Sequence, residues 1–215
     1  MPSLTLYTYW RSSSAYRVRI ALAVKNVPYA KVAVNLLSSE QTGNAYVELC
    51  PTAHVPCLVV DGKPLGESVA IIELLEELFP SPPLFPKDPW ARAQVRSLVE
   101  IVNAGIQPLQ NLQVLKRLSD DKDARAAWAR HFIARGLTAL EAVMARHHAE
   151  GTRGKFAYGD ALTAADCVLV PQIYNAKRFD VDLGPMPRVA AAYEAALGTA
   201  QVASAIPENQ PDASP

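Results

Sequence analysis

The stretch that decides the fold is a hydroxyl-rich turn leading directly into a helix, and it reads Arg11-Ser12-Ser13-Ser14-Ala15-Tyr16-Arg17-Val18-Arg19-Ile20-Ala21-Leu22. It follows a short alternating segment, Leu4 to Thr8, which predicts a β-strand. Hydroxyl side chains at a helix start cap backbone N–H groups that lack partners there. With the positive end of the helix dipole, they also form a site for an anion, including a thiolate. Both interpretations stay open, although capping alone needs one serine and leaves the flanking arginines unexplained.

The first 80 residues mix strand and helix patterns in a recognisable order. Tyr29 to Leu36 predicts a second strand, and residues 57–60 and 63–65 predict a hairpin around an Asp61-Gly62 turn. A further helix is expected from Ser68 to about Leu78. This order is typical of an α/β domain of the thioredoxin-like type. The first loop lacks a Cys-x-x-Cys motif, which excludes disulfide exchange by the protein itself.

The remainder of the chain predicts an all-α domain. Five prolines between residues 79 and 89 indicate a linker, assigned to residues 81–89. Helical patterns then extend over residues 90–118, 124–148 and 188–197. Between the last two, Thr163 and Asp166 resemble a capping box ahead of a buried helix that Pro171 should kink. The expected domains are therefore 1–80 and 90–204, followed by a loose polar tail over 205–215.

Composition excludes several classes of function. Half of the 215 residues are apolar, a fifth are charged, and the formal net charge is zero, so no basic stripe for nucleic acid is present. No apolar run reaches the roughly 18 residues of a membrane helix, and the N-terminus lacks a secretory signal pattern. Three widely spaced cysteines suit free thiols in a reducing cytoplasm. The four histidines lack the spacing of metal ligands, so no metal is expected.

The serine-rich stretch resembles the signature of zeta-class glutathione transferases, the family of maleylacetoacetate and maleylpyruvate isomerases. That family writes it Ser-Ser-Cys-x-Trp/His-Arg-Val-Arg-Ile-Ala-Leu, so Ser14 replaces the cysteine here and Tyr16 replaces the aromatic residue or histidine. Further matching motifs are residues 105–112, 170–172 and 176–183. The resemblance runs from about residue 4 to about residue 211. It implies a thioredoxin-like domain followed by the helical C-terminal domain of a glutathione transferase.

The resemblance also assigns the catalytic group. Ser12 occupies the position of the family's activating serine, with Ser13 and Ser14 as additional donors to the thiolate or the substrate. A charge-assisted hydrogen bond contributes roughly 1.5–3 kcal/mol and a helix N-terminus about 0.3–1 kcal/mol. Together they would lower the pKa of the glutathione thiol by about one to two units. Tyr7 is the rival donor, but an aromatic residue in a strand is more simply explained by packing.

Other motifs would hold the rest of glutathione. By resemblance to thioredoxin-like folds, the Val55–Pro56 bond is expected to be cis, which would turn the Val55 backbone towards the glutathione cysteine. Ser68 at a helix start would bind the γ-glutamyl carboxylate and Glu67 its ammonium group. The complete expected set is Ser12, Ser13, Ser14, Ala15, Tyr16, Arg17, Gln41, Val55, Pro56, Glu67, Ser68, Gln107, Asn111, Leu112 and Gln113.

The second substrate is expected between the domains, where family members act on dianionic diketo acids. Arg11 and Arg178 could each hold a carboxylate bidentately, although an ordinary surface ion pair remains the alternative for either arginine. Gln107 and Asn111 would face the same cleft from one turn of a long helix.

The resemblance therefore implies a cytoplasmic, homodimeric, glutathione-dependent isomerase that converts maleylacetoacetate to fumarylacetoacetate. The thiolate would add to the double bond, allow rotation and be expelled again. Maleylpyruvate is the alternative substrate. Two further alternatives are a general glutathione transferase or haloacid dehalogenase, and a non-catalytic binding module of the same fold. Intact Ser12, Val55-Pro56 and Glu67-Ser68 argue against the last.

Overall fold

The computed structural model describes residues 1–213 and divides into two compact units. The first unit combines residues 1–83 with the C-terminal residues from Ala200 onward, and the second comprises residues 84–199. None of the helices within the described residues is long and apolar enough to cross a membrane.

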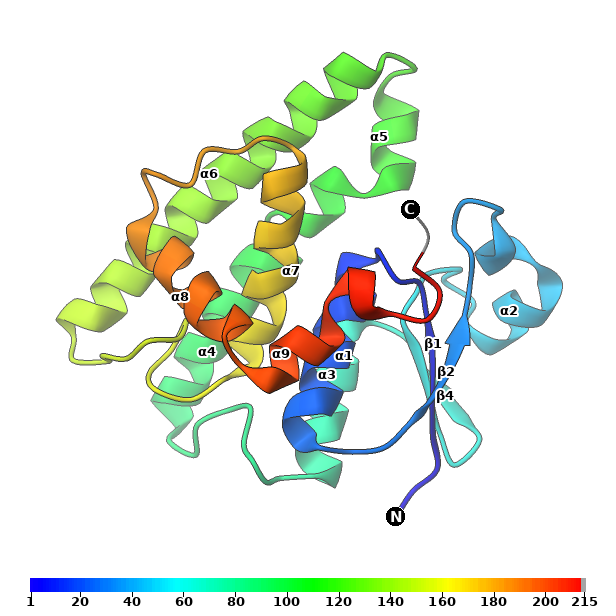
Figure 1. The fold of residues 1–215 in the computed structure, drawn as a ribbon, viewed down its shortest axis with the longest axis horizontal. Coiled ribbons are helices and arrows are strands. Elements are labelled where there is room, and N and C mark those ends of the chain that lie inside the picture. Colours follow the sequence, from blue (N-terminus) through cyan, green and yellow to red (C-terminus); the bar gives the residue numbers. More distant parts are fainter. Residues whose placement is uncertain (214–215) are drawn as a thin grey trace. The chain divides into compact units, whose positions relative to one another are not determined.

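The first unit is built on a four-stranded mixed sheet (Figure 1). The strands are β1 (Leu4–Thr8), β2 (Ala30–Ala33), β3 (Cys57–Val60) and β4 (Lys63–Leu65). Their order is β2-β1-β3-β4, with β1 parallel to β2 and the other neighbours antiparallel. Leu4, Leu6 and Thr8 alternate as the buried positions of β1. The predicted strand, hairpin and thioredoxin-like order are confirmed.

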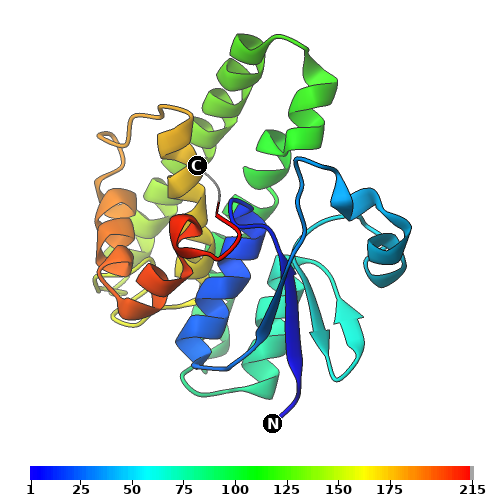
Figure 2. The same cartoon turned by 45° about the vertical axis from the view of Figure 1, so that its right-hand side comes forward.

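Two helices cover one face of this sheet, α1 (Ser13–Lys25) and α3 (Ser68–Leu78), while α2 (Asn44–Leu49) lies on the other (Figure 2). Helix α1 ends at Asn26, whose φ of 52° is the left-handed conformation common at helix C-termini. Near that end, Lys25 forms a buried ion pair with Glu76 of α3 and also donates to the carbonyl of Pro82 at 2.7 Å. The two helices and the proline-rich segment after α3 are thus joined by one buried ammonium group.

The second unit is all helical. Its helices are α4 (Pro89–Asn103), α5 (Leu112–Leu118), α6 (Lys122–Ala149), α7 (Ala164–Arg178) and α8 (Pro187–Leu197), with a 3₁₀ helix η2 (Gln107–Gln110) between α4 and α5. Helix α7 is buried along most of its length, which explains its apolar sequence. Its predicted capping box is confirmed, because the Asp166 carboxylate accepts hydrogen bonds from the backbone and hydroxyl of Thr163. Pro171 lies inside the helix as expected.

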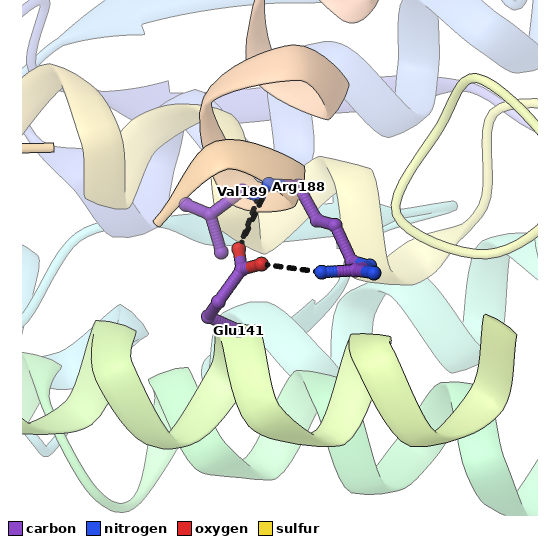
Figure 3. A network of polar contacts seen from close by, with 3 residues as sticks. All are labelled: Glu141, Arg188 and Val189. Atoms are coloured by element: carbon purple, nitrogen blue, oxygen red, sulfur yellow. Dashed lines mark hydrogen bonds and ion pairs between the residues drawn. The ribbon is translucent and has the colours of Figure 1, made fainter. Parts of the chain in front are cut away.

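The N-terminus of α8 is capped by the carboxylate of Glu141, a residue of α6 (Figure 3). One oxygen of Glu141 accepts from the backbone N–H groups of Arg188 and Val189, each at 2.9 Å, while the other oxygen lies 3.2 Å from the Arg188 guanidinium. An acidic group stabilises the positive end of a helix. The interaction therefore fixes α8 against α6.

Two segments differ from the sequence-based expectations. Leu84 and Phe85, expected in a linker, are buried, and the Leu84 carbonyl accepts from Ala164 N at 2.8 Å. Residues of the expected loose tail form the end of α9 (Ala200–Ala205) and a 3₁₀ helix η3 (Pro207–Asn209), and α9 packs against α1. Apolar residues and specific hydrogen bonds hold both segments, and composition alone does not reveal them. The final two residues of that expected tail lie outside the described residues.

Candidate functional site

The start of α1 combines capping with a free donor. Ser12 is the N-cap residue, and its Oγ accepts from the backbone N–H of Ala15 at 3.2 Å. Accepting that bond leaves the hydroxyl hydrogen of Ser12 available to a ligand. Ser13 and Ser14 form the first turn and, like Ser12, are half-buried. The two interpretations of this motif are therefore compatible, since the serine that caps the helix can also donate to an anion at its positive end.

Three neighbouring predicted contacts are placed deeper in the unit. Ala15 is fully buried and Tyr16 and Arg17 are each only 1% exposed. The side chains of Ala15 and Tyr16 thus belong to the core of the unit, where the Arg19 guanidinium lies 5.2 Å from the centre of the Tyr16 ring. Arg17 instead turns towards a second predicted site residue, since its Nη1 donates to Ser68 Oγ at 3.1 Å.

The start of α3 carries the next group of predicted residues. Ser68 is its first residue and is buried, while the preceding Glu67 is exposed. Glu67 has φ 65° and ψ 110°, a conformation that costs a non-glycine residue on the order of 1–3 kcal/mol and is concentrated at functional sites. Because Ser68 accepts from Arg17, its own hydroxyl hydrogen can be donated to a carboxylate at this helix start.

The loop before β3 has the predicted cis bond between Val55 and Pro56, and both residues are buried. Its backbone is held from α2, because Tyr46 Oη donates to the His54 carbonyl at 2.6 Å. The Cys50 thiol contacts the same carbonyl oxygen at 3.5 Å. These contacts fix the loop immediately before Val55, and no sequence pattern indicates them.

Tyr7 and the nearby cysteines behave as packing residues. The Tyr7 ring lies 6.0 Å from the ring of Tyr46 and packs against the cluster that contains Cys50 and Cys57. Burial raises the pKa of the Cys57 thiol to about 12, with a smaller contribution from Cys50, so Cys57 is protonated at neutral pH. Within the described residues none of the three cysteines forms a disulfide, and all three are buried. This arrangement supports the packing interpretation of Tyr7.

Two other predicted residues of the first unit have distinctive environments. The Oε1 atom of Gln41 is buried and has no hydrogen-bond partner within the described part of the chain, so it is available to accept from a ligand. Arg11 is half-buried, and its guanidinium lies over the Trp10 ring at 5.1 Å. Such stacking restrains the side chain while leaving the planar donor edge free for a carboxylate.

The predicted residues of the second unit do not share one continuous helix. Gln107 lies in η2, whereas Asn111 is the N-cap of α5 and accepts from Gln113 N at 3.0 Å. The expectation that Gln107 and Asn111 lie one turn apart on a long helix is therefore wrong. Helix α4 ends at Asn103, and Pro108 lies within the separate 3₁₀ turn that follows. Leu112 and Gln113 are exposed at the start of α5.

Two motifs of the second unit meet through a buried amide pair. Gln110 Nε2 donates to Gln172 Oε1 at 2.7 Å, which joins η2 to the middle of α7. Arg178 is the last residue of α7 and is exposed, and its Nη1 donates to Asn175 Oδ1 at 3.3 Å. The pairing of Gln110 with Gln172 was not predicted, although both residues lie in motifs that resemble the family, residues 105–112 and 170–172.

Comparison with known proteins identifies the family to which the chain is similar. Residues 2–77 match the family described as glutathione S-transferase, N-terminal domain. The chain is 45% identical over 212 residues to a probable maleylacetoacetate isomerase 2 of Drosophila melanogaster, covering 98% of this chain and 90% of that one.

Two solved structures extend the comparison. A maleylacetoacetate isomerase from Anaeromyxobacter dehalogenans 2CP-1 with glutathione bound in its active site is 48% identical, with a TM-score of 0.89 and 99% coverage of both chains. A holo bacterial maleylpyruvate isomerase of the zeta class is 40% identical, with a TM-score of 0.94, and the match covers 98% of this chain and all of that one. On the strength of these similarities over nearly its whole length, the chain belongs to the zeta class of the glutathione transferase family.

Proposed function

We propose that this chain is a glutathione-dependent isomerase that converts a cis diketo acid of the maleylacetoacetate type to its trans isomer. The observation that carries the proposal is Ser12, which caps α1 through its oxygen and keeps its hydroxyl hydrogen for a thiolate. Relatives named as maleylacetoacetate isomerases match almost the entire chain, which supports the same chemistry.

Five residues of the first unit fit parts of glutathione. Ser12 and the N-terminus of α1 suit the thiolate, and Ser68 with the start of α3 suits a carboxylate. The exposed Glu67 suits an ammonium group. The Oε1 atom of Gln41, which has no hydrogen-bond partner among the described residues, suits an amide N–H. Val55, in the loop that Tyr46 holds, would pair its backbone with the peptide.

Glutathione, when bound, would supply a thiolate that adds reversibly to the substrate's double bond and so permits rotation about that bond. The protein's part is to hold the charges. Ser12 donates a hydrogen bond that keeps the sulfur ionised before addition and after release. Ser13 and Ser14 donate to the negative charge that develops on the substrate's keto oxygen, which is electrostatic stabilisation of the transition state. Arg11 and Arg178 each bind one substrate carboxylate.

The decisive experiment is turnover of maleylacetoacetate and maleylpyruvate with glutathione present at far below the substrate concentration. Complete conversion of either acid, with glutathione recovered unchanged, supports an isomerase in which glutathione is a cofactor. Consumption of glutathione in proportion to product would instead indicate a general transferase or haloacid dehalogenase. Absence of any turnover, with glutathione binding retained or lost, would overturn the proposal in favour of a binding module.

Maleylpyruvate remains a second candidate substrate because the structural match to the zeta-class maleylpyruvate isomerase has a TM-score of 0.94. Preference for one acid is measured as the ratio of kcat/KM in the same turnover experiment. A ratio that favours maleylpyruvate would place this chain in aromatic degradation rather than in tyrosine and phenylalanine catabolism.

We also propose a cytoplasmic homodimer. Trp90, in the first turn of α4, is 73% exposed, and a large aromatic side chain in such a position suits an interface between two identical surfaces. Sedimentation velocity at micromolar concentration should give twice the chain mass of 23.3 kDa. The variant Trp90→Glu should shift the species towards the monomer, whereas a monomeric wild-type protein would contradict the proposal.

A further inference from the structure

The backbone of Trp10, two residues before Ser12, is held at both of its polar groups. Its N–H donates to Asp212 Oδ2 at 2.8 Å, a contact that spans 202 positions of the sequence. Its carbonyl accepts from Arg19 Nη2 at 2.9 Å. The next turn then closes through Ser12 N, which donates to the Tyr9 carbonyl at 3.0 Å. The position of Ser12 therefore depends on groups from α1 and from the C-terminus.

Arg19 links these elements inside the first unit. Its side chain is buried, and besides Trp10 it donates to the Thr8 hydroxyl at 3.2 Å and to the Tyr9 carbonyl at 3.3 Å. Its Nε donates to the Ala205 carbonyl at 3.2 Å, where α9 ends. One guanidinium thus connects the end of β1, the loop of residues 9–12 that contains Ser12 (the serine loop), and the start of the C-terminal segment.

The residues that follow, 206–213, form a C-terminal strap with an ordered conformation of its own. Gln210 is buried, and its Nε2 donates to the Ile206 carbonyl at 2.8 Å. Its Oε1 accepts from Lys31 Nζ at 2.9 Å, which ties the strap to β2. Ala213 packs against the cluster that contains Trp10. Asp212 therefore reaches the Trp10 N–H from a fixed segment, since residues on both sides of it are anchored.

We propose that Asp212 is a positioning residue for Ser12, and that the C-terminal strap sets the place of the serine loop. Asp212 and Arg19 hold the two backbone polar groups of one residue, and Ser12 follows in the same turn. Small misplacements of a catalytic group cause large losses of rate, about a hundredfold for 1 Å. This inference rests on the proposed function of Ser12 as the donor to the glutathione thiolate.

The test compares Asp212→Ala with Asp212→Asn in the full chain. Asparagine keeps an oxygen that can accept from Trp10 N, whereas alanine leaves that N–H without its partner. Glu208→Ala is the matched control, because it removes a carboxylate from the same strap without touching the Asp212–Trp10 bond. Three quantities are measured for each variant: kcat and KM for the isomerisation, the pKa of the bound glutathione thiol by ultraviolet absorbance, and hydrogen exchange at the Trp10 amide.

For Asp212→Ala we expect kcat to fall about tenfold, because a catalytic group that is slightly misplaced loses rate. The pKa of the bound thiol should rise, and the Trp10 amide should exchange faster. KM for the diketo acid should change little, and both Asp212→Asn and Glu208→Ala should remain close to the wild type. If Asp212→Ala is too unstable to purify, Asp212→Glu provides the comparison, because it keeps the charge but displaces the acceptor.

Two outcomes would overturn this inference while leaving the proposed function intact. The first is a wild-type kcat and thiol pKa in Asp212→Ala while Ser12→Ala impairs both, which would make the strap purely structural and leave the proposed function intact. The second is equal impairment of Asp212→Asn and Asp212→Ala, which would mean that the carboxylate acts through its charge. If Ser12→Ala itself has no effect, the proposed role of Ser12 fails, and this inference fails with it.

Discussion

Arg17 of α1 donates from Nη1 to Oγ of Ser68, the first residue of α3, at 3.1 Å, and both side chains are buried. The bond joins the helix that begins after Ser12 to the helix that begins after Glu67. It also fixes the direction of the Ser68 hydroxyl, since an oxygen that accepts from a guanidinium directs its own hydrogen elsewhere. Arg17 thus contributes to the proposed glutathione site by orienting a donor and by placing a positive charge behind it.

The first prediction is that Arg17→Met and Ser68→Ala each weaken glutathione binding and that their effects are not additive. A hydrogen bond that involves a charged group is worth roughly 1.5–3 kcal/mol, or about ten- to a hundredfold in Kd. Because both variants break the same interaction, the double variant should bind little more weakly than the worse single variant. Calorimetric titration of glutathione measures the cycle, with thermal unfolding as the control for folding. Strictly additive losses would mean that the two residues act independently.

The second prediction separates the two roles of Ser12. Ser12→Ala removes both the cap and the donor, so it should lower kcat at least tenfold and also cost about 1 kcal/mol of stability. Ser12→Asp keeps a capping oxygen but has no hydrogen to donate when ionised, so it should retain stability and lose activity. Ser12→Thr should retain both. Steady-state kinetics and chemical denaturation of the three variants measure these effects.

Two comparison variants complete that experiment. Ser14→Ala should cost less activity than Ser12→Ala, because Ser14 lies within the first turn and is not the cap. Tyr7→Phe should be nearly neutral, since the Tyr7 ring packs near Tyr46. A damaging Tyr7→Phe together with a neutral Ser12→Ala would show that the thiolate donor has been assigned to the wrong residue.

Local patterns predicted much of this fold because each depends on neighbours in the sequence. The alternation of residues 4–8, the Asp61-Gly62 turn and the capping box at Thr163 and Asp166 are all short-range features, and all are confirmed. The break between α4 and η2 was missed, because the apolar pattern continues past Asn103 although the helix ends there. Periodicity alone does not distinguish one long helix from two shorter ones in register.

Long-range contacts were beyond the reach of such patterns. Asp212 and Trp10 are 202 residues apart, so nothing local in either segment signals their hydrogen bond. The polar, proline-rich composition after residue 205 favours a loose tail, yet Gln210 and Ala213 are held by partners elsewhere in the first unit. In the candidate site, resemblance to a family suggested the roles proposed for Glu67 and Ser68, whereas the hydrogen bond from Arg17 to Ser68 is visible only in the structure.

The third prediction concerns the pH dependence of stability through Asp166. Complete burial raises its pKa to about 6, and hydrogen bonds from Ala157 and Thr163 oppose this shift only in part. The folded state holds this proton more tightly than the unfolded chain does. The contribution of protonated Asp166 to the free energy of unfolding is therefore complete below about pH 4 and is lost as the pH rises through 6. The total change is roughly 3 kcal/mol at 1.36 kcal/mol per pKa unit.

Asp166→Asn is the matched control, since it cannot titrate. The free energy of unfolding, measured by denaturant titration between pH 4 and 7, should fall with rising pH more steeply for the wild type than for Asp166→Asn. If the free energy of unfolding of the wild type instead rises with pH relative to that of Asp166→Asn, the prediction is wrong. The ionised carboxylate would then be the form that the capping box stabilises.

The last prediction tests the substrate. If Arg11 and Arg178 bind the two carboxylates of a diketo acid, replacing either by leucine should raise KM for isomerisation while barely changing conjugation of a neutral electrophile. Each lost charge-assisted contact is worth roughly 1.5–3 kcal/mol, or about ten- to a hundredfold in kcat/KM. Lysine at either position should restore only part of the loss, because an ammonium group cannot reproduce the bidentate geometry of arginine.

Arg135→Leu, on an exposed position of α6, serves as a control for the loss of one positive charge. Equal losses for charged and neutral substrates would assign the two arginines a structural role, and the proposed isomerase would then give way to a general transferase.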